Sequence, residues 1–186
     1  MYILNMILNM NLVMVATLIM AMLIAEEKEK NTLRTLMLTS LSPVEFLIGK
    51  ALITIFISVI VNIAIFFMLG IQLQYLLMYF IITTAVLISM VEIGAVIGIV
   101  SKNQMTTGTI GTPLGLFLFM IPTLSGLNKT FYKIATLLPN YNSIVILKKV
   151  FEGKNIIEGS GYNIFVIFAL VFFYFFRCCL FILPTN

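Results

Sequence analysis

Five stretches of the chain are apolar over about 20 consecutive residues, the length that a helix needs to cross the hydrocarbon core of a bilayer. None of them contains more than one Asp, Glu, Lys or Arg side chain. Only 10% of the 186 residues are charged, against roughly 25% in an ordinary soluble domain. The sequence therefore predicts an all-α, polytopic membrane protein that forms a single domain over residues 1–186. We place the five spans at residues 2–25, 46–69, 75–100, 105–124 and 162–183.

The first apolar stretch differs from a cleaved secretory signal. No Lys or Arg precedes residues 2–25, and the stretch is longer than the apolar part of a signal peptide, which has about 7–15 residues. We interpret it as a span that the protein retains. Asn5, Asn9 and Asn11 lie near its beginning, where we expect them at the membrane interface rather than in hydrogen bonds to a neighbouring helix.

The residue types that most enzymes use are scarce in this chain. It has no His and no Asp, and its two cysteines, Cys178 and Cys179, are adjacent, so neither a His/Cys/Asp metal cluster nor a Ser/His/Asp triad can form. A phosphate-binding loop is also missing, because each Gly-Lys pair is followed by Ala51 or Asn155 instead of Ser or Thr. The net charge of +4 comes from residues near the ends of the spans and forms no basic, aromatic surface for nucleic acid. We expect no catalysis, no bound cofactor and no nucleic-acid partner.

The segment between the first two spans, residues 26–45, is the most informative. It opens with a cluster of mixed charge that cannot enter lipid and continues as a helix with an apolar face at i, i+3, i+4 and i+7 spacing. Pro43 disfavours helix at the residue before it and can begin the next helix. These features predict a short amphipathic helix on the cytoplasmic membrane face. An ordinary polar connection between two spans is the alternative.

The order of features in residues 26–50 resembles the cytoplasmic segment of ATP-binding cassette type-2 permeases. The resemblance lies in a run Glu-Glu-Lys-Glu-x-x-Thr-Leu-x-x-Leu, a Thr/Ser-Leu-Ser-Pro turn and the run Glu-Phe-Leu-x-Gly-Lys. It implies a permease subunit of an exporter whose ATP and Mg²⁺ are bound by a separate ATPase subunit, in a bacterial plasma membrane, with a second permease as homodimer or heterodimer partner. The amphipathic helix would dock in a groove of the ATPase subunit through Glu26, Glu27, Lys28, Glu29, Thr32, Leu33, Arg34, Leu36, Met37, Ser40 and Pro43.

The resemblance also implies a topology that this chain does not fully match. Permeases of that family usually have six spans with both ends in the cytoplasm, whereas this sequence predicts five, with the N-terminus outside and the C-terminus inside. The charges on the two sides barely differ, so the orientation follows mainly from the resemblance. We expect the first helix of the family to be the missing one.

Residues 128–158 form a mixed segment before the last span. Within residues 131–151, apolar residues recur at helical spacing on both sides of Pro139, interleaved with Lys133, Lys148 and Lys149. Two short helices broken at the proline are predicted, and each is too short to cross the bilayer. They would lie on the outer membrane surface or re-enter it, as the resemblance implies for the Leu138-Pro139 step.

Glu92 is the only carboxylate inside a predicted span, and burying a charge there costs about 3 kcal/mol. It faces a cavity, a partner or a polar neighbour such as Asn62 or Ser89. A cation or proton site on the transport pathway and a neutral glutamate hydrogen-bonded between helices are both open.

Glycines and prolines in the third and fourth spans are candidates for close helix packing or a gate. Two glycines four residues apart lie on one helix face and let two backbones approach. Packing within the chain is the favoured reading over a dimer seam. The residues are Gly94, Gly98, Gly111, Pro113 and Gly115.

Two other classes of membrane protein fit the composition. One is an immunity or regulatory subunit that binds a partner without moving substrate. The other is a secondary transporter driven by an ion gradient. Binding of an ATPase subunit through residues 26–43 distinguishes the permease from the secondary transporter, and an efflux assay distinguishes it from the passive subunit.

Overall fold

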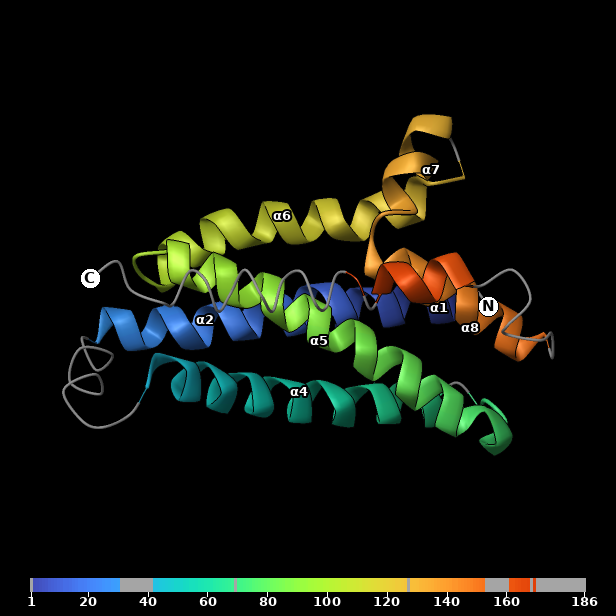
Figure 1. Cartoon of the computed structure of the whole chain (residues 1–186), viewed down its shortest axis with the longest axis horizontal. Helices are drawn as coiled ribbons and strands as arrows, with labels where there is room; N and C mark the ends of the chain where they lie inside the picture. The colour runs from blue at the N-terminus through green and yellow to red at the C-terminus, as the bar shows by residue number, and fades with distance from the viewer. Residues whose placement is uncertain are drawn as a thin grey trace.

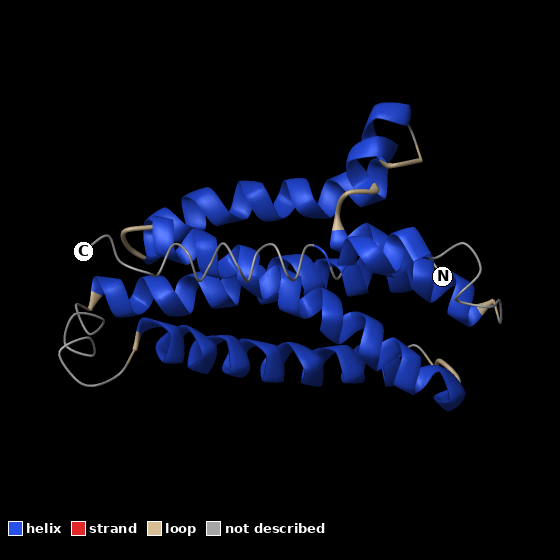
Figure 2. Ribbon diagram, viewed as in Figure 1, coloured by secondary structure: helices blue, strands red, loops and turns tan. Residues whose placement is uncertain are grey.

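The computed structural model describes residues 2–30, 42–68, 70–126, 128–152, 161–167 and 169, and in these the regular structure is entirely helical (Figure 2). The all-α prediction is confirmed for this part of the chain. Four of its helices are long and apolar enough to cross a membrane: Met6–Glu29, Val44–Met68, Leu73–Val100 and Gln104–Leu124. Most of the predicted fifth span, residues 162–183, lies outside the described residues.

The first span is one continuous helix with a change of winding in its N-terminal half. It consists of α1 (Tyr2–Met10), a π-helical segment η1 (Asn11–Val15) and α2 (Ala16–Glu29). Nothing in the hydrophobic pattern predicts the π-helical segment, because apolar residues surround it on both sides. The span runs through the middle of the bundle, where Leu12, Ala16 and Met20 are almost completely buried.

The helix of the second span, α4 (Pro43–Met68), begins at Pro43, the residue that the sequence marks as able to begin it. Pro43 occupies the first helical position, where its missing N–H costs no hydrogen bond. Ser42 and Glu45 form a capping box: the Ser42 backbone N–H donates to Glu45 Oε2 (2.8 Å), and the Glu45 N–H donates to Ser42 Oγ (3.2 Å). The cap places Glu45 in the first turn of the helix, just ahead of the predicted span at residues 46–69.

A tight turn joins α4 to the third span. Gly70 has a φ of 62°, the left-handed conformation that glycine adopts without strain, and a short 3₁₀ helix η2 (Leu73–Tyr75) leads into α5 (Leu76–Val100). The turn at Ser101 to Asn103 then leads into α6 (Gln104–Leu124), where the Asn103 side chain caps the helix by accepting from the Thr106 N–H. Despite its two internal prolines, α6 is continuous and not broken.

The tightest helix contact joins α2 to α5. A Cβ atom added at Gly94 would lie 2.4 Å from the Thr17 carbonyl oxygen, and one added at Gly98 would lie 2.8 Å from that of Ala21. Real Cβ atoms do not approach so closely, so only glycine allows the two backbones to meet in this way.

The glycines of α6 contact a neighbouring side of the same span. A Cβ at Gly111 would lie 2.9 Å from Leu18 Cδ2, and one at Gly115 would lie 2.9 Å from Met14 Sδ. These packing contacts are therefore made within the chain. Pro113 lies between the two glycines inside α6.

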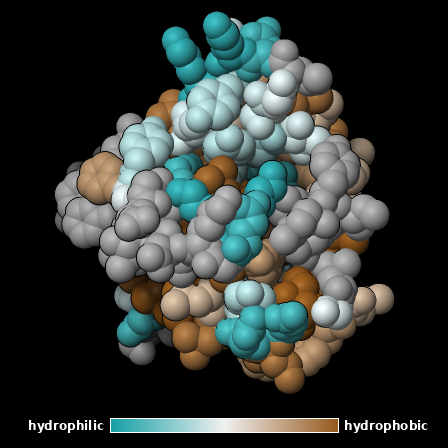
Figure 3. Space-filling model, turned by 90° about the vertical axis from the view of Figure 1, so that its right-hand side faces the viewer, coloured by the Kyte–Doolittle hydropathy of each residue, from teal (hydrophilic) through white to brown (hydrophobic). Residues whose placement is uncertain are grey.

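Two short helices follow α6, as the sequence predicts. They are α7 (Lys129–Ala135) and α8 (Pro139–Phe151), and Pro139 begins the second. In Figure 1, α7 projects from the bundle beyond the end of α6, while α8 lies beside α1. Hydrophilic residues gather around the α7 end of the molecule in Figure 3. Helix α8 is largely buried, with Asn140, Asn142 and Ser143 inaccessible.

Asn9 and Asn11 are in the interior of the bundle, so the expected position at the membrane interface was wrong. Their side chains are 2% and 4% exposed. Asn11 Nδ2 donates to Asn62 Oδ1 on α4 (2.7 Å), and Asn9 Oδ1 accepts from Asn140 Nδ2 on α8 (2.8 Å). A buried amide in an apolar surrounding needs such a partner, which these two find on neighbouring helices. The side chain of Asn5 is outside what the structure describes.

Candidate coupling site

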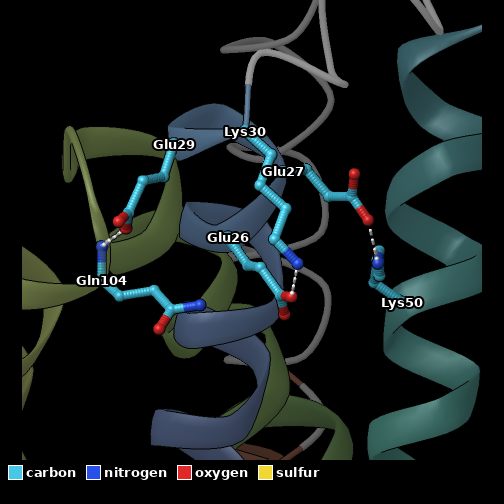
Figure 4. A network of polar contacts seen from close by, with 6 residues as sticks. All are labelled: Glu26, Glu27, Glu29, Lys30, Lys50 and Gln104. Atoms are coloured by element: carbon cyan, nitrogen blue, oxygen red, sulfur yellow. Dashed lines mark hydrogen bonds and ion pairs between the residues drawn. The ribbon is translucent and has the colours of Figure 1, made fainter.

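The charged cluster that follows the first span does not leave the bundle. Residues 26–29 continue α2 without a break, and Lys30 follows as a turn residue. We call residues 26–30 the charged end of α2. Figure 1 places it at the end of the molecule where α4 and α6 begin and α5 ends. Figure 4 shows its contacts with α4 and α6.

Glu27 connects the charged end to α4. Its Oε1 lies 2.7 Å from Lys50 Nζ, and the two side chains are 22% and 19% exposed. An ion pair that is partly withdrawn from water is screened less by salt than an exposed pair. Lys50 also lies 5.6 Å from the centre of the Phe46 ring on the same helix. The pair therefore holds the beginning of α4 against the end of α2.

Lys28 connects the charged end to α5. Its Nζ donates to the carbonyl oxygens of Gly98 (3.2 Å), Ser101 (3.1 Å) and Ile99. The last carbonyls of a helix have no partner within the helix and carry the negative end of its dipole. A lysine ammonium has three donors and matches this group of acceptors. Lys28 thus caps the C-terminus of α5 from another helix.

Glu29 connects the charged end to α6. Its Oε2 accepts a hydrogen bond from the backbone N–H of Gln104 (3.0 Å), the first residue of that helix. The first N–H groups of a helix are unpaired and lie at the positive end of the dipole, so a carboxylate is favoured there. The acidic and basic residues of the charged end therefore match the polarity of the helix ends that they contact.

The fourth contact, between Glu26 and Lys30, is local. The two side chains form an i, i+4 ion pair on the exposed side of the charged end. The hydrogen bond and the negative charge of Glu26 raise the pKa of Lys30. Exposed pairs of this kind add little stability. Three of the five residues thus bind α4, α5 and α6, while the other two remain on the accessible surface.

The described residues cover only part of the predicted docking helix. Thr32, Leu33, Arg34, Leu36, Met37 and Ser40 lie outside them, so the amphipathic helix and its apolar face stay a prediction. Pro43 is the first residue of α4. The segment enters and leaves the described structure at Lys30 and Ser42, at the same end of the bundle.

The hydrophobic pattern gave no indication of two participants, Lys50 and Gln104. Lys50 is the only basic residue of α4, and a single charge near the start of a span is a detectable signal for an ion pair with the preceding polar segment. Gln104 contributes a backbone atom, and no residue type could have identified it. The capping box at Ser42 and Glu45 follows the pattern Ser-x-x-Glu and was detectable.

Glu92 lies on α5, half-buried, and its Oε2 has no hydrogen-bond partner among the described residues. The predicted neighbour Asn62 bonds instead to Asn11, and the Ser89 hydroxyl is likewise buried without a partner in the described part. The structure therefore does not join Glu92 and Asn62 into one site.

A comparison with protein families gives a match that covers nearly the whole chain. A family model described as "ABC-2 family transporter protein" matches residues 1–177. No curated protein and no solved structure matches the chain significantly.

Proposed function

Because the chain belongs to the ABC-2 transporter family, we propose that it is the permease subunit of an ATP-driven exporter in the bacterial plasma membrane. Family membership identifies a multi-pass membrane component of a transporter. The exporter direction and the separate ATPase subunit, which binds ATP and Mg²⁺, are the proposed parts.

The charged end of α2 supports this proposal most strongly. It binds the beginnings of α4 and α6 and the end of α5 through Glu27, Glu29 and Lys28. A force applied at this point reaches four spans at once, because the contacts are ionic or charge-assisted and sit at the helix ends. A permease that has no ATPase of its own needs such a point of force transfer.

The ATPase subunit would act on the segment that joins α2 to α4. Residues 31–41 lie between the charged end and the Ser42 cap in sequence, so a partner that grips them pulls on both helices. Glu26 and Lys30, at the accessible side of the charged end, would contribute to partner choice through charge complementarity. Movement of the gripped segment would change the tilt of α2 and α4 and so open the pathway alternately to the two sides.

Two permease halves would form the complete transporter, either as a homodimer or with a related chain. On the opposite membrane side, α7 and α8 would be the external re-entrant helices. Glu92 is the candidate for a cation or proton site on the pathway, because its carboxylate lies within a span and one of its oxygens has no partner in the described residues. The dimer and the external position of α7 and α8 are proposed from the family, and the Glu92 site from the position of its carboxylate.

Photocrosslinking from the docking segment tests the proposal. A photoreactive amino acid replaces Arg34 in the full-length chain, and the membranes are irradiated and analysed by mass spectrometry. The matched control carries the same amino acid at Gln74, an exposed residue in the turn at the other end of α4. We expect Arg34, and not Gln74, to crosslink to a protein that has a Gly-x-x-x-x-Gly-Lys-Ser/Thr loop and hydrolyses ATP.

Other outcomes separate the alternatives. Crosslinks from Arg34 to a protein without a phosphate-binding loop would favour an immunity or regulatory subunit. Substrate transport by the purified chain alone, driven by an ion gradient, would favour a secondary transporter. Either result contradicts the proposed role.

A further inference from the structure

The π-helical segment η1 interrupts the first span at a position with an unusual density of polar contacts. π-Helical turns are rare and are found mostly as single turns at functional positions. This one spans Asn11–Val15, and Leu12 and Val13 within it are completely buried. A π-helical turn in the buried part of a span calls for a structural explanation.

The π-helical turn sets the direction of the Asn11 side chain, which bonds to Asn62 on α4. Met20 and Glu27 face α4, since Met20 Sδ accepts a hydrogen bond from Thr54 Oγ1 (3.8 Å) and Glu27 pairs with Lys50. Asn11 precedes Met20 by nine positions, so in a regular helix, at about 100° per residue, it would point roughly 180° away from Met20. A π turn holds about one more residue than an α turn, so it rotates Asn11 back by about 100° and leaves it only about 80° from the direction of Met20.

That rotation brings Asn11 to a polar stripe on α4. Lys50, Thr54, Ser58 and Asn62 follow one another at intervals of four residues and occupy one face of the helix. Asn11 Nδ2 donates to Asn62 Oδ1, and the Tyr79 hydroxyl on α5 donates to the Asn62 carbonyl oxygen (3.2 Å). The winding of η1 thus connects the N-terminal half of the first span to α4 and α5.

Asn9 connects α1 to the other group of helices, α6 and α8. It lies two residues before Asn11, on another side of the helix, and its Nδ2 donates to the Phe119 carbonyl oxygen of α6 (3.3 Å). Its Oδ1 accepts from Asn140 Nδ2, which also donates to the Leu118 carbonyl oxygen (2.9 Å). Asn9 in α1 and Asn11 at the start of η1 therefore hold the N-terminal half of the first span between two groups of helices, α4 with α5 and α6 with α8.

The C-terminal half of the span, α2, is fixed in its orientation. The backbone contacts at Gly94 and Gly98 hold α2 against α5, and the charged end holds its last turn. We propose that η1 is a rotational joint: when its π turn winds into an α-helix, α1 rotates by about 100° relative to α2 and releases both asparagine contacts together.

The asparagine contacts are suited to breaking and re-forming, because several of their buried amide atoms make no hydrogen bond among the described residues. Asn11 Oδ1, Asn62 Nδ2 and Asn140 Oδ1 are buried and have no hydrogen-bond partner among the described residues. A network with unpaired groups stabilises its state less than a complete one. If the proposed transport function is correct, release of Asn140 would free α8 at the outer end of the pathway, and the joint would link that end to the span that the ATPase moves.

The joint can be tested on the chain alone, without a partner or a substrate. With Cys178 and Cys179 replaced by alanine, spin labels are attached at Met10 on α1 and Leu77 on α5, which are 56% and 67% exposed. Pulsed electron spin resonance measures the distance between the labels in lipid nanodiscs. Asn11→Leu removes the Asn11–Asn62 contact, and we expect a second distance population. Its shift is up to about 8 Å, because a label on a helix 10–12 Å wide moves by that chord in a 100° turn.

Two further variants keep the test specific. Thr17→Val also removes a buried hydrogen bond, from Thr17 Oγ1 to the Met90 carbonyl oxygen, but on the fixed α2, and should give no second population. Deletion of Val13 removes the extra residue of the π turn, so Asn11→Leu in that background should also give a single population. A single unchanged distance in Asn11→Leu, or the same second population in either comparison variant, overturns the joint. Because no ATPase is present, failure here would leave the proposed transport function untouched.

Discussion

Replacing Gly94 by alanine perturbs the tightest contact in the bundle. The new Cβ would lie 2.4 Å from the Thr17 carbonyl oxygen, whereas ordinary contacts begin at 3.4 Å, so α2 and α5 must separate by about 1 Å at this point. The obstacle is backbone, which cannot move aside as a side chain can. Overpacking of this kind costs about 1–3 kcal/mol.

Gly108→Ala is the matched control. It is the same substitution inside a span, but no heavy atom lies within 4 Å of the new Cβ. Alanine in a helix is more favourable than glycine by about 0.5–1 kcal/mol, so this variant should be as stable as the original or slightly more stable.

Reversible unfolding of both variants in mixed micelles with increasing SDS, followed by far-UV circular dichroism, measures the difference. We expect Gly94→Ala to unfold at a clearly lower SDS fraction than Gly108→Ala. Equal midpoints for the two variants would show that the backbones of α2 and α5 do not meet at Gly94.

Three further substitutions probe the charged end of α2 and the pathway. Lys28→Met should destabilise the chain by about 1.5–3 kcal/mol in the same unfolding assay, because the carbonyls at the end of α5 lose a charged donor. The double-mutant cycle of Glu27→Gln and Lys50→Gln should give a coupling energy of about 0.2–1 kcal/mol, and purely additive effects would show that the ion pair does not stabilise the chain. Glu92→Gln should alter the pH dependence of transport in the assembled exporter; an unchanged profile would remove Glu92 from the pathway.

The sequence predicted the parts of this structure that depend on apolar length. Stretches of about 20 apolar residues located the described spans, and Pro139 located the break between α7 and α8. These features are local, because a span must satisfy its backbone within itself wherever it lies in the bundle.

The features that sequence reasoning missed depend on neighbours that are distant along the chain. Asn9 and Asn11 could have been interfacial, and only the positions of Asn62 and Asn140 make them buried contacts. The π turn also depends on a distant neighbour, because it directs the Asn11 side chain toward Asn62 on α4. The residues of the charged end were identified as important, but their binding to helix ends within the chain was not foreseen, since Lys28 and Glu29 meet backbone atoms about 70 and 75 residues away.

The side of the membrane on which the charged end lies is the most direct test of the proposed coupling. In a chain with Cys178 and Cys179 replaced by alanine, a cysteine at Lys30 and, separately, one at Gln74 are exposed to a membrane-impermeant maleimide, in intact cells and in inverted membrane vesicles. We expect the cysteine at position 30 to react in the vesicles only and the one at position 74 in intact cells only. Reaction at position 30 in intact cells would place the charged end outside the cell, beyond the reach of a cytoplasmic ATPase, and would contradict its role in coupling.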